Sequence, residues 1–238
     1  YLNNVGNTIN LLDAMVRHGV RAFVFSSSAA IFGEPQYLPI NESHPTSPLS
    51  PYGRSKLIVE QVLADYDAAY RLKSACLRYF NAAGADPKGA LGERHQPETH
   101  LIPLVLQAAA GLRPNITIFG DDYDTPDGTC IRDYVHVEDL CTAHLLALEK
   151  LINEGISLAF NLGSGAGFSV DQVIMAARGI TGKDIQVVVA GRRDGDPARL
   201  VADSRLAREV LGWNPRYAGL EDMIRHSWNF LIKQSSLR

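Results

Sequence analysis

Residues 20–28 read VRAFVFSSS, and this stretch decides the fold. The apolar run Val20–Phe25 predicts a short buried strand that ends in three consecutive serines. Apolar residues at helical spacing predict a helix over 3–18 before this strand and another over 52–71 after it. A second strand is predicted over 74–80. The alternation of strands and helices predicts parallel βαβ units, and therefore an α/β layer fold.

The chain from about residue 86 onward has a different pattern. It is rich in loops and its predicted elements are short, which indicates a smaller mixed α/β lobe in the C-terminal part. The predicted helices cover 101–111 and 137 to about 151, and the predicted strands cover 116–119 and 134–136. Further segments at 157–161, 169–180, 185–189, 204–211 and 220–232 complete this part.

Composition and charge exclude several classes of function. Of the 238 residues, 46% are hydrophobic and 21% are charged, which is typical of a globular protein. The net charge of -3 provides no basic excess for nucleic acid, and no apolar run is long enough to cross a membrane. The three cysteines lack paired spacing, which favours a reducing compartment and a cytoplasmic location. The spacing of His136 and His144 does not match a zinc site, so we predict no metal.

A tyrosine and a lysine four residues apart open the second predicted helix, in the stretch Tyr52-Gly53-Arg54-Ser55-Lys56. This spacing places both side chains on one face of the helix. A phenol with a pKa of about 10 is a poor base at neutral pH, and a nearby ammonium lowers that pKa. The pair can therefore act as a proton shuttle. Ser26-Ser27-Ser28 end the preceding strand at the edge where open α/β sheets bind ligands, so a serine hydroxyl there can bond the same oxygen.

Arginines in the second half are candidates for binding a diphosphate. They are Arg132, and Arg192-Arg193 near Asp196. The guanidinium group suits this role because its planar fork binds phosphate oxygens bidentately. Residues 163–167, GSGAG, resemble a phosphate-binding loop, but they lie too late in the chain for the first βα turn of a dinucleotide fold. We therefore predict a turn there.

Six motifs follow one another in an order that is typical of one family. They are SSS at 26–28, Tyr52 with Lys56, LRYFN at 77–81, IRDYVHV at 131–137, NLGSG at 161–165 and RRDGDP at 192–197. Together they resemble the extended short-chain dehydrogenase/reductase superfamily, and most closely its UDP-glucose 4-epimerase family. The resemblance covers essentially the whole chain. It implies a Rossmann-type parallel sheet with a smaller mixed α/β lobe, and an isomerase of galactose metabolism that keeps NAD bound.

The resemblance also implies a mechanism and individual roles. A UDP-hexose, UDP-glucose or UDP-galactose, would be epimerised at C4 through a transient 4-keto sugar. Tyr52 would take the proton of the sugar 4-hydroxyl, Ser28 would bond the 4-oxygen, and Lys56 would hold the nicotinamide ribose and lower the Tyr52 pKa. The NAD contacts would be Asn3, Ser28, Tyr52, Lys56 and Phe80. The UDP-sugar contacts would be Ser28, Tyr52, Asn81, His100, Leu101, Thr117, Ile118, Phe119, Arg132, Arg193 and Asp196, with the two arginines at the diphosphate and Asp196 at a ribose hydroxyl.

The resemblance divides the chain into two parts. Residues 1–85 would be the C-terminal part of the NAD-binding Rossmann domain. Residues 86–238 would mainly form the UDP-sugar-binding lobe, with about 131–163 returning to the Rossmann domain. The family's first strands and glycine-rich turn would form a segment of about 95 residues before Tyr1, so we expect this chain alone to bind NAD weakly and to be inactive. The helices over 3–18 and 53–71 would form the interface of a homodimer.

Three alternative functions are considered, of which two stay open and one is disfavoured. A UDP-N-acetylhexosamine or UDP-pentose epimerase on the same scaffold stays open, because the aliphatic Leu200 near a specificity position does not decide between sugars. A 4,6-dehydratase is disfavoured, because Ser28-Ala29-Ala30 supplies no Asp-Glu pair. An inactive nucleotide-sugar-binding chain stays open if the protein truly starts at Tyr1.

Overall fold

The structure is a computed structural model that describes residues 1–235. The chain forms two compact units. Unit 1 contains residues 1–80, 141–163 and 202–214, and unit 2 contains residues 81–140, 164–201 and those from 215 onward. Among the helices within residues 1–235, none is both long enough and apolar enough to cross a membrane.

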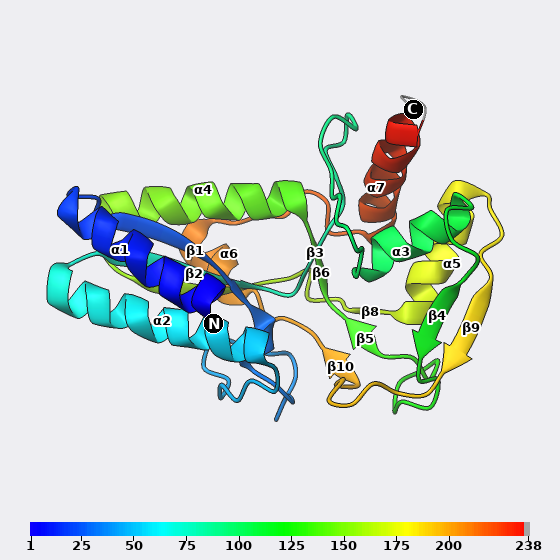
Figure 1. Ribbon diagram of the computed structural model, residues 1–238, viewed down its shortest axis with the longest axis horizontal. Coiled ribbons are helices and arrows are strands. Elements are labelled where there is room, and N and C mark those ends of the chain that lie inside the picture. The colour runs from blue at the N-terminus through cyan, green and yellow to red at the C-terminus, as the bar shows by residue number, and fades with distance from the viewer. Residues whose placement is uncertain (236–238) are drawn as a thin grey trace. The chain divides into compact units, whose positions relative to one another are not determined.

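Unit 1 is built on a parallel sheet of three strands, in the order β1–β2–β7 (Figure 1). The strands are β1 (Ala22–Ser28), β2 (Lys73–Tyr79) and β7 (Leu158–Leu162). Ser28 pairs with Tyr79, and Tyr79 pairs with Leu162. The carboxyl ends of all three strands therefore meet at one edge. The prediction of a parallel sheet in an α/β layer fold is confirmed.

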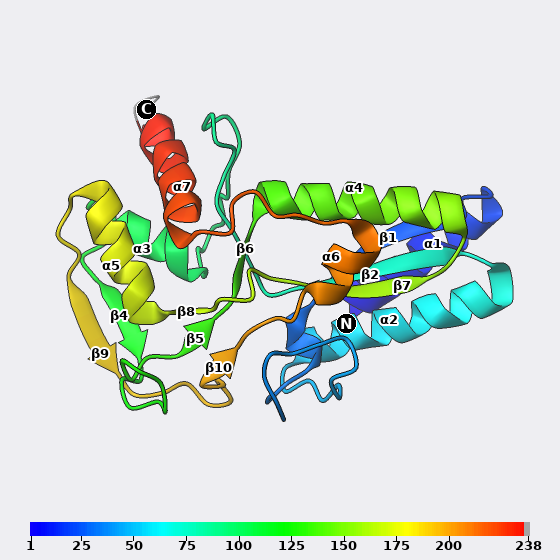
Figure 2. The same ribbon diagram turned by 180° about the vertical axis from the view of Figure 1, so that it is seen from behind.

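Helices cover both faces of this sheet (Figures 1 and 2). On one face lie α1 (Asn7–Arg17) and α2 (Pro51–Tyr70), and on the other lies α4 (Val137–Glu154), of which residues 141–154 belong to unit 1. The short helices η2 (Ala29–Ile31) and α6 (Arg205–Leu211) complete the unit. The core between α1, α2 and the sheet contains Leu12, Phe25, Val59, Leu63, Leu72 and Cys76.

The predicted helix over 3–18 begins differently from expected. Residues Leu2–Gly6 form a π-helical turn, η1, before α1 starts at Asn7. The amide of Gly6 donates to the carbonyl of Tyr1 at 3.2 Å, which closes a turn one residue wider than that of an α-helix. The side chain of Asn4 donates to Ser55 of α2 at 3.0 Å. This wider turn is therefore fastened to the neighbouring helix.

A buried ion pair joins α2 to the sheet. Arg78 of β2 donates to Glu60 of α2 with an N–O distance of 2.6 Å, and the two side chains are only 13% and 9% exposed. Ser27 of β1 donates to the same carboxylate at 2.5 Å. Removing one partner of such a pair leaves an uncompensated charge in a poorly solvated place, which is strongly destabilising. The pair thus fixes the position of α2 against β1 and β2.

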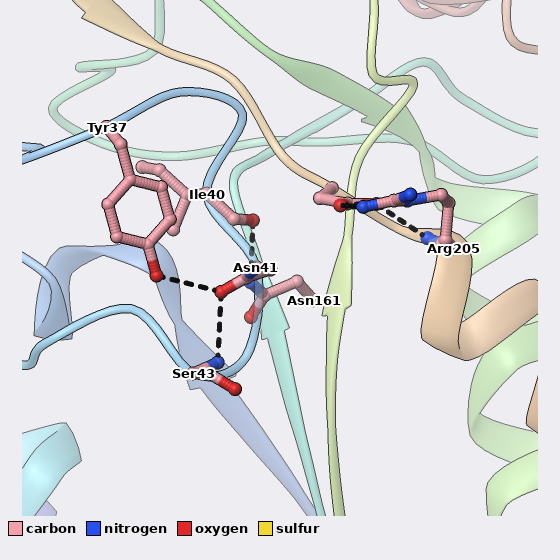
Figure 3. Close-up of polar contacts among 7 residues, drawn as sticks. Tyr37, Ile40, Asn41, Ser43, Asn161 and Arg205 are labelled. Atoms are coloured by element: carbon pink, nitrogen blue, oxygen red, sulfur yellow. Dashed lines mark hydrogen bonds and ion pairs between the residues drawn. The ribbon is translucent and has the colours of Figure 1, made fainter.

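The loop between η2 and α2 is held by its own polar contacts and by β7 (Figure 3). Asn41 accepts from the Tyr37 hydroxyl at 3.0 Å and from the Ser43 amide at 3.1 Å. The buried Asn161 of β7 donates to the carbonyl of Ile40 at 2.9 Å. These bonds satisfy the loop's polar groups where it crosses unit 1.

Unit 2 contains small sheets and three mutually packed helices. Strands β3 (Asn81–Ala83) and β6 (Tyr134–His136) pair in parallel, as do β4 (Ile116–Phe119) and β9 (Val187–Ala190). A third sheet has the order β10–β5–β8, with β10 (Arg199–Leu200), β5 (Ile131–Arg132) and β8 (Phe168–Ser169). Helices α3 (Leu101–Ala109), α5 (Val170–Thr181) and α7 (Leu220–Ser235) pack on one another. The core side chains include Ile102, Val105, Leu106, Val173, Ile174 and Ile224.

Most predicted elements are present, but the prediction missed four short strands. These are β3, β5, β8 and β10, of which three have only two residues. Two or three residues are too few for a strand periodicity to show in the sequence. The mixed α/β character of the second part is confirmed.

Two buried histidines meet in the core of unit 2. The Nε2 atom of His136 lies 3.0 Å from Nδ1 of His226. The Glu138 amide donates to Nδ1 of His136 at 3.1 Å, so Nε2 carries the His136 proton and donates to His226. Burial, reinforced by repulsion from His226, lowers the pKa of His136 to about 4. The His136 ring therefore packs as a neutral group at neutral pH.

Acid should weaken this protein through His136. Because its folded-state pKa lies below the ordinary value of about 6.5, the unfolded chain takes up a proton first as the pH falls. We expect a loss of about 3 kcal/mol of unfolding free energy between about pH 6.5 and pH 4 from this group. Urea unfolding across this range should show a shallower pH dependence for His136→Asn than for the wild type. The exposed His18→Gln variant is the control, and equal slopes for wild type and His136→Asn would contradict the assignment.

Candidate active site

The start of α2 is fixed by three local features. Ser50 caps the helix, since its hydroxyl accepts from the Gly53 amide at 3.1 Å, and Pro51 occupies the first turn. Gly53 lies against η2, where an added Cβ would be only 2.3 Å from the carbonyl oxygen of Ala30. Only glycine allows this approach, which sets the position of Tyr52 beside the end of β1.

Ser28, Tyr52 and Lys56 come together at the carboxyl end of β1, as predicted from their positions. The Ser28 oxygen accepts from the Ala30 amide at 3.2 Å, and the Ser28 hydroxyl hydrogen-bonds with the Tyr52 phenol. Lys56 Nζ lies 5.6 Å from the centre of the Tyr52 ring and donates to the carbonyl of Ser26 at 2.9 Å. A half-exposed phenol, a hydroxyl and an ammonium therefore share one small region.

The pKa of Tyr52 differs from the expectation. Burial raises it above its ordinary value, and the hydrogen bond from Ser28 offsets this in part. Lys56 does not lower it here, because its ammonium points to the Ser26 carbonyl. The pKa of Lys56 is itself lowered by burial. In this arrangement the position of Lys56 does not account for the Tyr52 pKa, and the role predicted for Lys56 stays a prediction.

The other two residues predicted to contact NAD also lie in unit 1. Phe80 follows β2, and its amide donates to the carbonyl of Leu162 at 3.3 Å. Asn3 is exposed in η1, where its carboxamide bonds with Asn4 and Asn7. Their roles stay predictions.

The arginines and Asp196 lie in unit 2. Arg132 of β5 forms an ion pair with Asp196, and its other arm donates to the Ile131 carbonyl at 2.7 Å. The guanidinium of Arg193 lies 3.7 Å from the centre of the Phe119 ring on β4, a cation–π contact. Arg192 lies 4.3 Å from the centre of the Tyr123 ring and also pairs with Asp122 at 2.7 Å. This ion pair distinguishes Arg192 from Arg193.

The remaining predicted substrate residues are distributed over unit 2. Thr117 and Ile118 lie on β4 next to Phe119. Asn81 begins β3, and its carboxamide donates to the Asp133 carbonyl at 2.7 Å. His100 immediately precedes α3, which begins at Leu101, and its ring bonds with Glu93. No sequence pattern indicated this last contact.

The loop at 163–167 is a turn, as predicted, and Asp133 explains why. This buried carboxylate accepts from the Ser164 amide at 2.8 Å, the Ser164 hydroxyl at 2.7 Å and the Gly165 amide at 3.0 Å. The donors that a phosphate would use are therefore already engaged. Sequence reasoning missed Asp133, because one acidic residue in a short polar segment gives no pattern.

Known proteins share this fold and these motifs. The model of the NAD dependent epimerase/dehydratase family matches residues 1–163, and the chain belongs to this family. A UDP-glucose 4-epimerase of Halalkalibacterium halodurans is 55% identical over 97% of this chain and 69% of its own length. The structure of a UDP-glucose 4-epimerase from Brucella ovis in complex with NAD is 50% identical, with a TM-score of 0.94 over 97% of this chain and 71% of that one. That of a Bifidobacterium longum UDP-glucose 4-epimerase, with NAD+ and UDP, is 41% identical, with a TM-score of 0.93 over 99% and 70%. The family resemblance carried by the six motifs is confirmed.

Replacing Gly53 should disturb the start of α2. Gly53→Ala places a Cβ against a backbone carbonyl that cannot turn away, so we expect a loss of about 1–3 kcal/mol of unfolding free energy. The matched control is Gly179→Ala in α5, where an added Cβ meets nothing within 4 Å. That change should stabilise the protein by about 0.5–1 kcal/mol. Thermal unfolding of both variants checks this, and a stable Gly53→Ala variant would contradict the steric account.

Proposed function

We propose that the protein is a UDP-hexose 4-epimerase that uses NAD and interconverts UDP-glucose and UDP-galactose. The observation that carries the proposal is the group of Ser28, Tyr52 and Lys56 at the carboxyl edge of a parallel sheet. The names and bound ligands of the relatives support it. The residues in unit 2 support it further, because they provide two guanidinium groups for a diphosphate.

The chemistry of the residues in unit 1 fits NAD. The Lys56 ammonium is a hydrogen-bond donor beside the Tyr52 ring, and an ammonium donor suits the ribose hydroxyls of a nicotinamide nucleotide. We propose that Asn3 and Phe80 complete the contacts to NAD. When bound, NAD supplies reversible hydride transfer at C4 of the sugar.

Tyr52 is the proposed acid and base for the sugar 4-hydroxyl. Its phenol takes the hydroxyl proton when the alcohol is oxidised and returns the proton when the ketone is reduced. Ser28 donates its single hydroxyl hydrogen to the phenol, and it can redirect that bond to the sugar 4-oxygen when substrate is bound. Because burial raises the Tyr52 pKa, a positive group must come closer before the phenol acts as a base at neutral pH. Lys56, turning from the Ser26 carbonyl, is the candidate for that charge.

The UDP moiety is the proposed ligand of unit 2. Arg193, stacked on Phe119, and Arg132 would bind the diphosphate, and Asp196 would accept from a ribose hydroxyl. If the Asp196 carboxylate bonds with a ribose hydroxyl instead of with Arg132, the guanidinium group of Arg132 becomes available to bind phosphate. Contacts from Asn81, His100, Leu101, Thr117 and Ile118 would complete the site. Tight binding of UDP retains the substrate while the oxidised sugar turns, because the binding energy comes from a part that does not react.

Proton NMR of UDP-galactose tests the activity. The assay uses the protein as encoded, with any residues that the reading frame places before Tyr1, and with added NAD. We expect conversion to UDP-glucose, and a loss of about 10²- to 10⁴-fold in rate for Tyr52→Phe. The matched control is Tyr70→Phe, which removes an exposed hydroxyl at the other end of α2. An unchanged UDP-galactose spectrum with the wild type, or full activity in Tyr52→Phe, would exclude the proposal.

We also propose a homodimer, and a cytoplasmic location for it. The helices over 3–18 and 53–71 lie side by side on one face of the sheet. Leu11 on the first of them is 49% exposed, and Leu2 before it is 82% exposed. Such apolar side chains on an outer surface favour a partner. The three cysteines, all free thiols in the structure, are compatible with a reducing compartment.

Light scattering after size exclusion tests the dimer. The wild type should have twice the mass of one chain at micromolar concentration, and Leu11→Glu should give the mass of one chain. Leu91→Glu, which changes an equally apolar but more exposed side chain in unit 2, should leave the mass unchanged. A monomeric wild type would reject the proposed interface.

A further inference from the structure

The loop before α3 gathers four groups that can bind a metal. They are the side chains of Glu93, His95, Glu98 and His100, and one donor atom of each lies within 4.8 Å of those of the others. The sequence predicted no metal, because the spacing of His136 and His144 does not match that of a zinc site. We propose that this group, the His-Glu cluster, binds one Zn²⁺ ion.

The distances suit a single ion. His95 Nδ1 lies 2.8 Å from Glu93 Oε1 and 3.7 Å from Glu98 Oε1, and His100 Nδ1 also bonds with Glu93 Oε1. Donors that surround Zn²⁺ tetrahedrally at about 2.1 Å are about 3.4 Å apart. Two imidazoles that converge on one carboxylate oxygen thus have donor separations close to those of a zinc site. Imidazole and carboxylate are both established zinc donors.

The cluster is supported by backbone groups and remains accessible. Glu98 Oε1 accepts from the amides of Thr99 at 2.7 Å and His100 at 2.9 Å, which orients this carboxylate. The side chains of Glu93 and Glu98 are 21% and 6% exposed, whereas both imidazoles are 54% exposed. Partly buried carboxylates with exposed imidazoles leave one side open for an ion to enter.

The neighbourhood holds the loop in place. An added Cβ at Gly92 would be 2.4 Å from the ring of Phe230 on α7, so the backbone before Glu93 lies directly on that helix. Glu93, His95 and Glu98 form part of the wall of a cavity of about 380 Å³, together with Leu106 of α3 and Phe230. A metal here would fasten the loop to the start of α3. No step of the proposed hydride transfer uses this ion, so the inference goes beyond the proposed function and does not depend on it. His100 is shared with the predicted UDP-sugar contacts, so metal binding is tested without a nucleotide sugar present.

Cobalt titration of the untagged, metal-free protein tests the site. Co²⁺ reports this coordination directly, because in a site of low symmetry it absorbs visible light and Zn²⁺ does not. We expect a visible band that saturates at one Co²⁺ per chain and disappears on addition of one equivalent of Zn²⁺. We also expect Zn²⁺ to raise the melting temperature of the wild type. A wild type without a saturable band would overturn the proposal.

Two variants connect the signal to the cluster. His95→Gln and Glu98→Gln keep the side-chain size and should each weaken Co²⁺ binding by about 100-fold or more. His18→Gln, an exposed histidine at the end of α1, should bind Co²⁺ as the wild type does. Circular dichroism confirms that the variants are folded. Unchanged Co²⁺ affinity in folded His95→Gln and Glu98→Gln would overturn the proposal.

Discussion

The parallel pairing of β1 with β2 is the constraint on which the structure of unit 1 depends. Their register places Ser28 opposite Tyr79, so both strands end at one edge of the sheet. The helix that connects two parallel strands must run back against them, and its first residues therefore lie at the same edge. Tyr52 is the second residue of that helix. Topology alone thus places the Tyr52 phenol beside Ser28, although the two residues are 24 positions apart in the sequence.

The topology sets the position of α2 only approximately, and an ion pair and close packing then fix it. The buried contact between Arg78 and Glu60 holds α2 against the sheet, and the absence of a side chain at Gly53 lets the helix touch η2. The Lys56 ammonium donates to the Ser26 carbonyl, and burial raises the Tyr52 pKa. The proposed catalytic side chains are therefore brought together with the phenol in its protonated form.

The pattern of apolar residues was sufficient to predict the long helices of unit 1 and two of its three strands, β1 and β2. It also predicted β4 and β6 with their bounds unchanged. The order of six motifs in the sequence identified the family and predicted that Ser28, Tyr52 and Lys56 lie in one site. Contacts between single polar residues could not be predicted, and Glu60 with Arg78 is the clearest case. In the sequence, Glu60 and Arg78 cannot be told from charged residues on a solvated surface. Only the packing of α2 on β2 makes them partners. The His-Glu cluster could not be predicted for a similar reason, because its four donors come together only when the loop is folded.

The central claim is that Tyr52 handles only the proton on the sugar oxygen, while the hydrogen on C4 leaves and returns as hydride. The segment Ser28-Ala29-Ala30 carries no carboxylate that could remove a proton from carbon. UDP-galactose deuterated at C4 tests this most directly, with the product analysed by NMR and mass spectrometry. The account predicts UDP-glucose that retains deuterium at C4 and gains none of the solvent's hydrogen there. Loss of the C4 deuterium to water would contradict it.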